Sequence, residues 1–121
     1  MKTILVAEDH DVNRELVKEI LESAGYAVME AADGEEVLSL LENKRPDLIL
    51  IDLQMPKLDG AGTLKKIRAS AEWRALPVIA CTAFAMENDR EEALKAGFDG
   101  YLSKPITMAG LLAAVELMSG A

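Results

Sequence analysis

The sequence has one cysteine, no long apolar run and few basic residues, and each scarcity excludes a class of protein. Cys81 cannot form an internal disulfide, and its position in an apolar run predicts a buried, unreactive thiol. No apolar stretch approaches the length of a membrane span, and the N-terminus lacks a signal-peptide layout, so we expect a cytoplasmic protein without a membrane segment. With 13 Lys and Arg against 21 Asp and Glu, the net charge of −8 is poorly suited to binding nucleic acid.

The length and composition are typical of one compact domain. The chain has 121 residues, of which 50% are hydrophobic and 28% are charged, so it can bury a real core. It contains no internal repeat, low-complexity tract or linker. We expect a single domain over residues 1–121, with no room for an output domain that binds DNA or catalyses a reaction.

Five short apolar segments predict β-strands. They are residues 3–7, 27–31, 48–52, 77–82 and 100–103. The first, third and fourth do not alternate polar with apolar residues, which is typical of strands buried on both faces.

Helical patterns of apolar residues separate these strands. They lie at residues 12–24, 37–41, 64–67, 93–94 and 111–115. Asp11 and Gly25 stand where the first helix should have its N-cap and C-cap, and Asp33 with Glu36 predicts a capping box for the second. Gly97 should close the fourth helix.

Strict alternation of strands and helices predicts an α/β fold. The expected architecture is a flavodoxin-like, five-stranded parallel sheet with strand order 2-1-3-4-5, right-handed crossovers and five helices on its two faces. Ligands bind such sheets beyond the carboxyl ends of the strands, where the strand order reverses. Here that point lies between the first and third strands.

Polar residues follow four of the predicted strands at their carboxyl ends. They are Glu8, Asp9, Asp52, Thr82 and Lys104. Because carboxyl ends of parallel strands share one edge of the sheet, we expect these side chains to gather there. His10 lies beside the acid pair, where we expect an exposed loop residue.

The chemistry of this set follows from its charge. Two carboxylates about 4 Å apart repel by roughly 4 kcal/mol at an effective dielectric of 20. Lys104 alone cannot balance three acids, and Mg²⁺, which prefers oxygen ligands, is the natural supplement. A carboxylate can also act as a nucleophile toward phosphorus, so Asp52 is best interpreted as a phosphate acceptor, with Lys104 and the Thr82 hydroxyl stabilising the phosphoryl oxygens.

Four segments resemble a known family, the receiver domains of two-component response regulators. They are "LVAED" at 5–9, "LILIDLQMPKLDG" at 48–60, "VIACTAFAM" at 78–86 and "YLSKPI" at 101–106. The resemblance covers essentially the whole chain, and the set in this order is highly specific. The last two segments are most similar to stand-alone receivers, such as those of chemotaxis, and to the receivers of hybrid kinases.

The resemblance implies a set of metal ligands. Asp52 is similar to the phosphoacceptor and Asp9 to the direct Mg²⁺ ligand, while Glu8 is similar to a partner acid that acts largely through water. Gln54 would offer its backbone carbonyl to the metal. Glu8 stands where many members have Asp, which changes the fine geometry and keeps the carboxylate.

The resemblance also implies a switch and its partners. Thr82 is similar to the switch hydroxyl, Tyr101 to the switch aromatic and Lys104 to the phosphoryl-binding lysine. The donor would be a phosphohistidine on a histidine kinase or phosphotransfer protein. A downstream protein would bind the face formed by the fourth helix, fifth strand and fifth helix, where Met86 is also expected. Phe84 should shield the phosphoryl group from water and slow its loss.

The expected function is therefore that of a single-domain response regulator in a phosphorelay. It would catalyse its own phosphorylation with Mg²⁺ and would not be a turnover enzyme. One alternative is a receiver excised from a larger hybrid kinase or response regulator. The kinase, target, pathway and oligomeric state are left open.

Three other functions on this kind of fold are less consistent with the residues. An aspartyl-phosphate phosphatase needs a general acid two residues after its nucleophile, and Gln54 cannot serve there. A flavin mononucleotide binder needs a phosphate-cradling loop after the first strand, and the acidic "EDHDVN" would repel phosphate. A receiver that no longer accepts phosphate would not need Asp52, Thr82 and Lys104 together.

Overall fold

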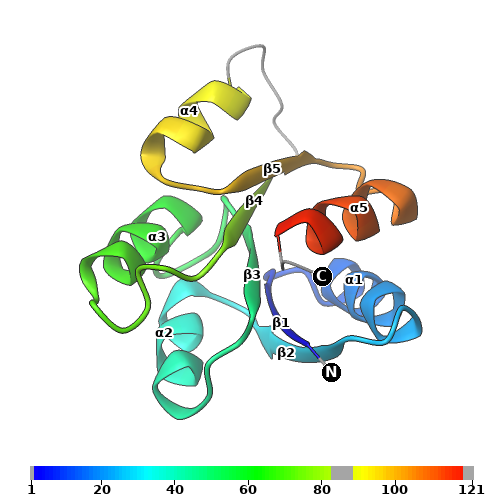
Figure 1. The fold of residues 1–121 in the computed structure, drawn as a ribbon, viewed down its shortest axis with the longest axis horizontal. Helices are drawn as coiled ribbons and strands as arrows, with labels where there is room; N and C mark the ends of the chain where they lie inside the picture. Colours follow the sequence, from blue (N-terminus) through cyan, green and yellow to red (C-terminus); the bar gives the residue numbers. More distant parts are fainter. Residues whose placement is uncertain (1, 83–88, 119–121) are drawn as a thin grey trace.

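The computed structural model describes residues 2–82 and 89–118, and this part of the chain alternates strictly between strands and helices (Figure 1). The strands are β1 (Thr3–Ala7), β2 (Ala27–Ala31), β3 (Leu48–Asp52), β4 (Val78–Thr82) and β5 (Gly100–Ser103). The helices are α1 (Asp11–Ser23), α2 (Gly34–Asn43), α3 (Gly60–Ala69), α4 (Asp89–Ala96) and α5 (Met108–Met118).

The strands form one parallel sheet in the order β2-β1-β3-β4-β5. This confirms the α/β fold and the strand order predicted from the sequence. The strand predicted at 77–82 begins one residue later. Pro77 has no N–H to donate, although its carbonyl accepts a hydrogen bond from Ile49.

The sheet is covered on both faces, and its central strands are buried throughout. Helices α1 and α5 lie on one side, and α2, α3 and α4 lie on the other (Figure 1). Side chains of alternate residues along each strand pack into the two hydrophobic cores, one on each face of the sheet. Leu5, Ile49 and Ile51 pack in one core, while Ile4 and Leu50 pack in the other.

The expected helix ends are mostly confirmed. Asp33 caps α2 by accepting a hydrogen bond from the N–H of Glu36, as the capping-box pattern predicts. Gly97 has a positive φ and directly follows α4, as expected, whereas the C-cap of α1 is Ala24 and the predicted Gly25, also with a positive φ, comes one position after it. Asp11 was predicted to be an N-cap, which is wrong by one position. His10 occupies the cap, and the Asp11 carboxylate instead binds Arg14.

Two apolar residues of the pattern at 12–24 are not part of the core. Val12 is 81% exposed and Leu16 is 52% exposed, whereas Val17 and Leu21 are buried. Neighbouring residues on a helix are about 100° apart, so the row Val12–Leu16 lies beside the buried row and faces outward.

The structure bears on the single cysteine and on the lack of a long apolar segment. The Cys81 thiol is buried in β4, and its burial raises its pKa to about 12, which makes it unreactive as predicted. Among residues 2–82 and 89–118, no helix combines the length and apolar character that crossing a membrane requires.

Candidate functional site

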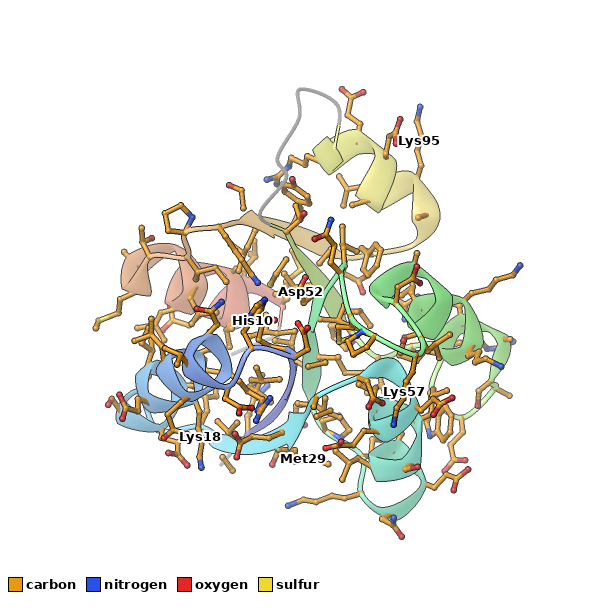
Figure 2. All side chains as sticks on the ribbon, turned by 180° about the vertical axis from the view of Figure 1, so that it is seen from behind. His10, Lys18, Met29, Asp52, Lys57 and Lys95 are labelled. Carbon is orange, nitrogen blue, oxygen red and sulfur yellow. The ribbon has the colours of Figure 1, made fainter. Side chains whose placement is uncertain are left out.

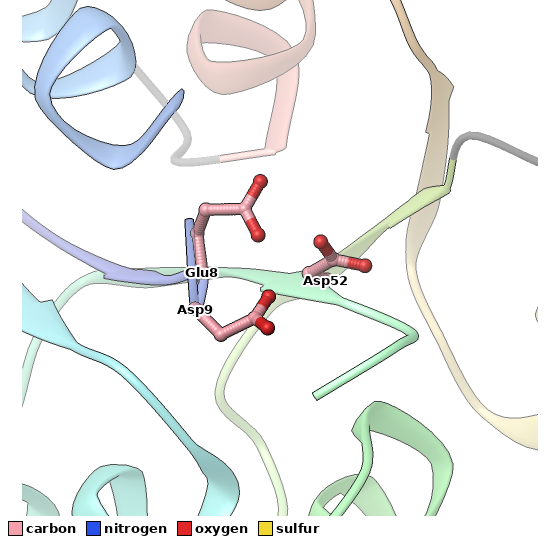
Figure 3. Close-up of side chains that lie close together, drawn as sticks. All are labelled: Glu8, Asp9 and Asp52. Atoms are coloured by element: carbon pink, nitrogen blue, oxygen red, sulfur yellow. The ribbon is translucent and has the colours of Figure 1, made fainter. Parts of the chain in front are cut away.

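The carboxyl ends of β1 and β3 bring three acids together. Ala7 pairs with Ile51, so the residues that follow, Glu8 and Asp52, lie side by side. Their carboxylates and that of Asp9 point into a shared space (Figure 3). Asp52 lies near the middle of the molecule, whereas Lys18 and Lys95 lie at its periphery (Figure 2). The predicted meeting of the strand-end acids is therefore observed.

These acids form a compact set of oxygen ligands. Glu8, Asp9 and Asp52 each offer a carboxylate oxygen, and these atoms lie within 4.8 Å of one another. Glu8 and Asp52 are each only 5% exposed. Within the part of the chain that the structure describes, the buried Oε2 of Glu8 and Oδ1 of Asp9 have no hydrogen-bond partner. Buried carboxylate oxygens without partners are costly, so this arrangement suits a hard divalent cation.

Lys104 supplies positive charge to the same space. Its Nζ lies 2.5 Å from Oε1 of Glu8 and 2.7 Å from Oδ2 of Asp52. Its backbone N–H donates to the carbonyl of Thr82 at 2.8 Å, which continues the pairing of β4 with β5. One lysine among three carboxylates leaves a formal charge of −2, which a divalent cation would neutralise.

Burial and neighbouring charges shift the pKa values of these groups. Burial, followed by the proximity of Asp52, raises the pKa of Glu8 to about 7, although Lys104 acts in the opposite sense. Burial would also raise the pKa of Asp52, but its interactions with Glu8, Lys104 and the N–H of Gln54 outweigh burial and lower it. Burial would lower the pKa of Lys104, and the two acids raise it. Asp52 is thus the acid held ionised.

The turn after β3 holds the carboxylate of Asp52 and packs against its carbonyl. The N–H of Gln54 donates to Oδ1 of Asp52 at 2.9 Å, and the N–H of Gly60 donates to the carbonyl of Leu53. A Cβ on Gly60 would lie 2.8 Å from the carbonyl oxygen of Asp52, so only glycine permits this close approach. Lys57 has a φ of 65° within the same turn. The turn therefore packs directly against the acid.

The other predicted site residues lie nearby in different settings. Thr82 is buried at the end of β4 and lines a hollow of about 360 Å³ together with the exposed Gln54. Tyr101, in the middle of β5, is half-buried and packs against the core. His10 is exposed, as expected. Phe84 and Met86 lie outside the described residues.

The sequence did not predict one contact to residues 8–10, which we call the acid loop. The guanidinium of Arg14 donates a hydrogen bond of 2.7 Å to the backbone carbonyl of Glu8, and it also binds Asp11 and Glu30. The spacing of Asp11 and Arg14 suggests a helical ion pair, but no sequence signal connects Arg14 with Glu30 on β2.

Comparison with known proteins identifies the family. The family model described as "Response regulator receiver domain" matches residues 4–116. The polar-differentiation response regulator DivK of Brucella anthropi is 36% identical over 98% of this chain and 97% of its own length. These matches agree with the resemblance seen in the site segments.

Solved structures agree in both fold and sequence. The receiver domain of the sensor histidine kinase PA1611 from Pseudomonas aeruginosa, with a magnesium ion coordinated in its active-site cleft, has a TM-score of 0.90 and 39% identity, covering 99% of this chain and 98% of that one. The chemotaxis response regulator CheY4 of Vibrio cholerae has a TM-score of 0.90 and 30% identity, with 98% of each chain covered. The strand-end acids and the lysine between them thus lie on the fold of a family of signalling switches, and this chain belongs to the response regulator receiver domains.

Proposed function

We propose that this chain is a single-domain response regulator of residues 1–121 that accepts a phosphoryl group on Asp52. The donor is a phosphohistidine on a histidine kinase or phosphotransfer protein. One observation carries the proposal. Asp52 is almost fully buried, yet its pKa is lowered, and its Oδ2 lies 2.7 Å from the ammonium of Lys104. A buried carboxylate kept ionised beside a cation is prepared to act as a nucleophile.

The transfer exchanges one bond to phosphorus for another. A carboxylate oxygen of Asp52 attacks the phosphorus in line, the P–N bond to the donor histidine breaks, and its electron pair returns to the imidazole. Lys104 then donates to a phosphoryl oxygen, because its ammonium already lies against the carboxylate that becomes phosphorylated. Each chain accepts one phosphoryl group in this transfer, so it is not a turnover enzyme.

The cation site is formed by the three acids. Glu8, Asp9 and Asp52, with the backbone carbonyl of Gln54, would hold Mg²⁺, which neutralises charge on the carboxylates and the phosphoryl oxygens. Buried oxygens of Glu8 and Asp9 that have no hydrogen-bond partner among the described residues support this assignment. Glu8 is longer than the Asp that many receivers have at this position, and it keeps the carboxylate. Its proposed role is to balance charge and to orient water.

The switch is assigned to Thr82 and Tyr101. The Thr82 hydroxyl would bond to the phosphoryl group and move toward it, which leaves space for the ring of Tyr101 to turn inward. Phosphorylation shifts the population toward the active form only if these contacts favour it. The readout face lies along β5 and the helices beside it. There Arg90, Tyr101 and Ile106 help to line a hollow of about 410 Å³ that suits a downstream protein.

The donor is proposed to dock over the opposite flank of the site. A groove of about 420 Å³ runs between α1 and the segment 104–106, and it is lined by Leu16, Ile20 and Ile106 as well as by Glu8 and Lys104. An apolar groove that opens directly beside the acceptor is suited to a donor helix that presents its histidine to Asp52. The acidic residues on the outer face of α1 favour a donor with basic flanks.

A mass measurement tests the proposal. Incubation with acetyl phosphate and Mg²⁺ should add one phosphoryl group to the intact protein, and Asp52→Asn should abolish the addition. Asp47→Asn is the matched control, because Asp47 precedes the same strand and caps Thr3 at the far end of the sheet. Equal phosphorylation of Asp52→Asn and the parent would refute the assignment.

A receiver within a longer chain is the second candidate. The 39% identity to a receiver domain of a sensor histidine kinase favours it. The site chemistry would be the same, but output would pass to a covalently joined domain. An immunoblot of the native cells separates the two, since a single-domain protein migrates near 13.1 kDa.

A further inference from the structure

Arg14 connects three separate parts of the fold at the rear of the acid loop. Its Nη1 donates to the backbone carbonyl of Glu8 at 2.7 Å, its Nη2 binds Asp11 at 2.7 Å, and its Nε binds Glu30 at 3.3 Å. The side chain is only 18% exposed. A second cation, Lys18, binds the other oxygen of Glu30 at 3.3 Å. The guanidinium is therefore held in place from two sides while it binds the loop.

The bond to Glu8 falls at the point where the backbone leaves the sheet. The N–H of Glu8 still pairs with the carbonyl of Ala31 on β2, as a strand residue would. The carbonyl of Glu8 belongs to the next peptide group, which leads to Asp9, and it accepts its hydrogen bond from Arg14. His10 then begins α1 by accepting from the N–H of Arg14. A single residue thus holds the loop at both of its ends.

We propose that Arg14 is a positioning residue for the cation site. By fixing the peptide group between Glu8 and Asp9, it holds two mutually repelling carboxylates in a cation-binding arrangement before any cation arrives. The inference rests on the proposed function, because it concerns the same three acids. It adds a determinant of cation affinity that touches neither the cation nor the phosphoryl group.

Removal of the Arg14 side chain should change the affinity for the cation in opposite directions, depending on whether its charge or its positioning of the loop dominates. Loss of the positive charge of Arg14 would make the site more negative and would tighten cation binding. Loss of the hydrogen bond to Glu8 would free the peptide group and weaken binding, because the carboxylates would have to be ordered on binding. The sign of the change in affinity therefore discriminates between the two causes.

The experiment compares three variants with the parent. Arg14→Met keeps an unbranched side chain but removes both the positive charge and the forked N–H donors of the guanidinium. Arg14→Lys keeps the charge and removes only the forked donors. Arg68→Met is the matched control. Arg68 binds the carbonyls of Leu76 and Gly97, which precede β4 and β5 at the opposite end of the sheet. MgCl₂ is titrated while backbone amide shifts are followed, at a temperature where every variant is folded.

We expect Arg14→Met to bind Mg²⁺ about 10-fold more weakly than the parent, the low end of the range for residues that support metal ligands. Arg14→Lys should also bind more weakly, and Arg68→Met should bind as the parent does even though it is less stable. In the metal-free protein, the amide order parameters of residues 8–10 should fall in Arg14→Met and not in Arg68→Met.

Each other outcome overturns a defined claim. Unchanged or tighter binding by Arg14→Met would overturn the positioning role and leave the cation site intact. If Arg14→Met does not fold, the Mg²⁺ affinity of Arg14→Lys provides the test. An affinity equal to that of the parent would then overturn the positioning role of Arg14. A parent that binds no Mg²⁺ would overturn the proposed cation site itself, and the inference with it.

Discussion

Glu8 should make the stability of the metal-free protein depend on pH in an unusual direction. Its pKa is raised from 4.5 to about 7, first by burial and then by Asp52. Between these two values the native state binds more protons than the unfolded state. The free energy of unfolding therefore falls as pH rises through this range, whereas a paired carboxylate with a lowered pKa would give a rise.

The size of the effect follows from the shift. A pKa unit corresponds to about 1.4 kcal/mol, so the loss of stability between pH 4.5 and 7 is at most about 3 kcal/mol. The pKa of about 7 already includes the contact with Lys104 at 2.5 Å, which favours the charged carboxylate. Asp52, with a pKa lowered from 3.8, and Lys104, with a pKa raised from 10.5, change their contributions outside this range.

The perturbation is Glu8→Gln, which is uncharged at every pH and keeps an oxygen for Lys104. In EDTA, urea unfolding should show the parent losing stability from pH 4.5 to 7 while the variant does not. Near pH 7 the variant should be the more stable protein. In millimolar Mg²⁺ the order should reverse, because the parent gains binding energy that the variant lacks.

Glu42→Gln is the matched control. It removes an exposed carboxylate of α2, so it should keep the slope of the parent. A parent whose stability is flat or rises over this range in EDTA would refute the reasoning, as would a Glu8→Gln variant with the same slope as the parent.

Three further changes test the rest of the site. Asp9→Asn should lower or abolish the rise in melting temperature that millimolar Mg²⁺ gives the parent, as measured by a thermal scan, because a proposed metal ligand loses its charge. Thr82→Ala should still be phosphorylated by acetyl phosphate but should weaken the amide-shift response of residues 89–106, and an unchanged response would remove Thr82 from the switch. Leu16→Lys should slow phosphorylation by a histidine donor while leaving phosphorylation by acetyl phosphate unchanged, and equal slowing by both donors would instead indicate damage to the site.

The strands and their order could be predicted because the sheet is buried on both faces. Residues 4–7, 48–51 and 78–81 are apolar without alternation, which is typical of strands in a parallel sheet covered by helices. The carboxyl-end rule then placed Glu8, Asp52 and Lys104 together without any knowledge of their side-chain contacts. Topology carried this prediction, since strands aligned in parallel leave their final residues on one edge.

The surface of α1 could not be predicted in the same way. The apolar pattern of α1 includes Val12 and Leu16, which are exposed, as well as Val17 and Leu21, which are buried. Periodicity identifies an apolar stripe, but it does not say how wide a part of that stripe the sheet covers. Here the apolar stripe is wider than the area that the sheet covers, and the exposed Leu16 lines the groove beside Lys104.

The position of Lys104 illustrates how strand pairing can prepare a site for a group that arrives later. The lysine lies beyond the last residue of β5, yet its N–H still pairs with the carbonyl of Thr82. Its backbone is therefore held in place like that of a strand residue, and only its side chain is free to rotate toward a binding partner. Before phosphorylation the ammonium lies between Glu8 and Asp52. Under the proposed function, phosphorylation of Asp52 would add negative charge close to this ammonium. Because only its side chain would need to move, Lys104 could then bind the phosphoryl oxygens without any movement of the sheet.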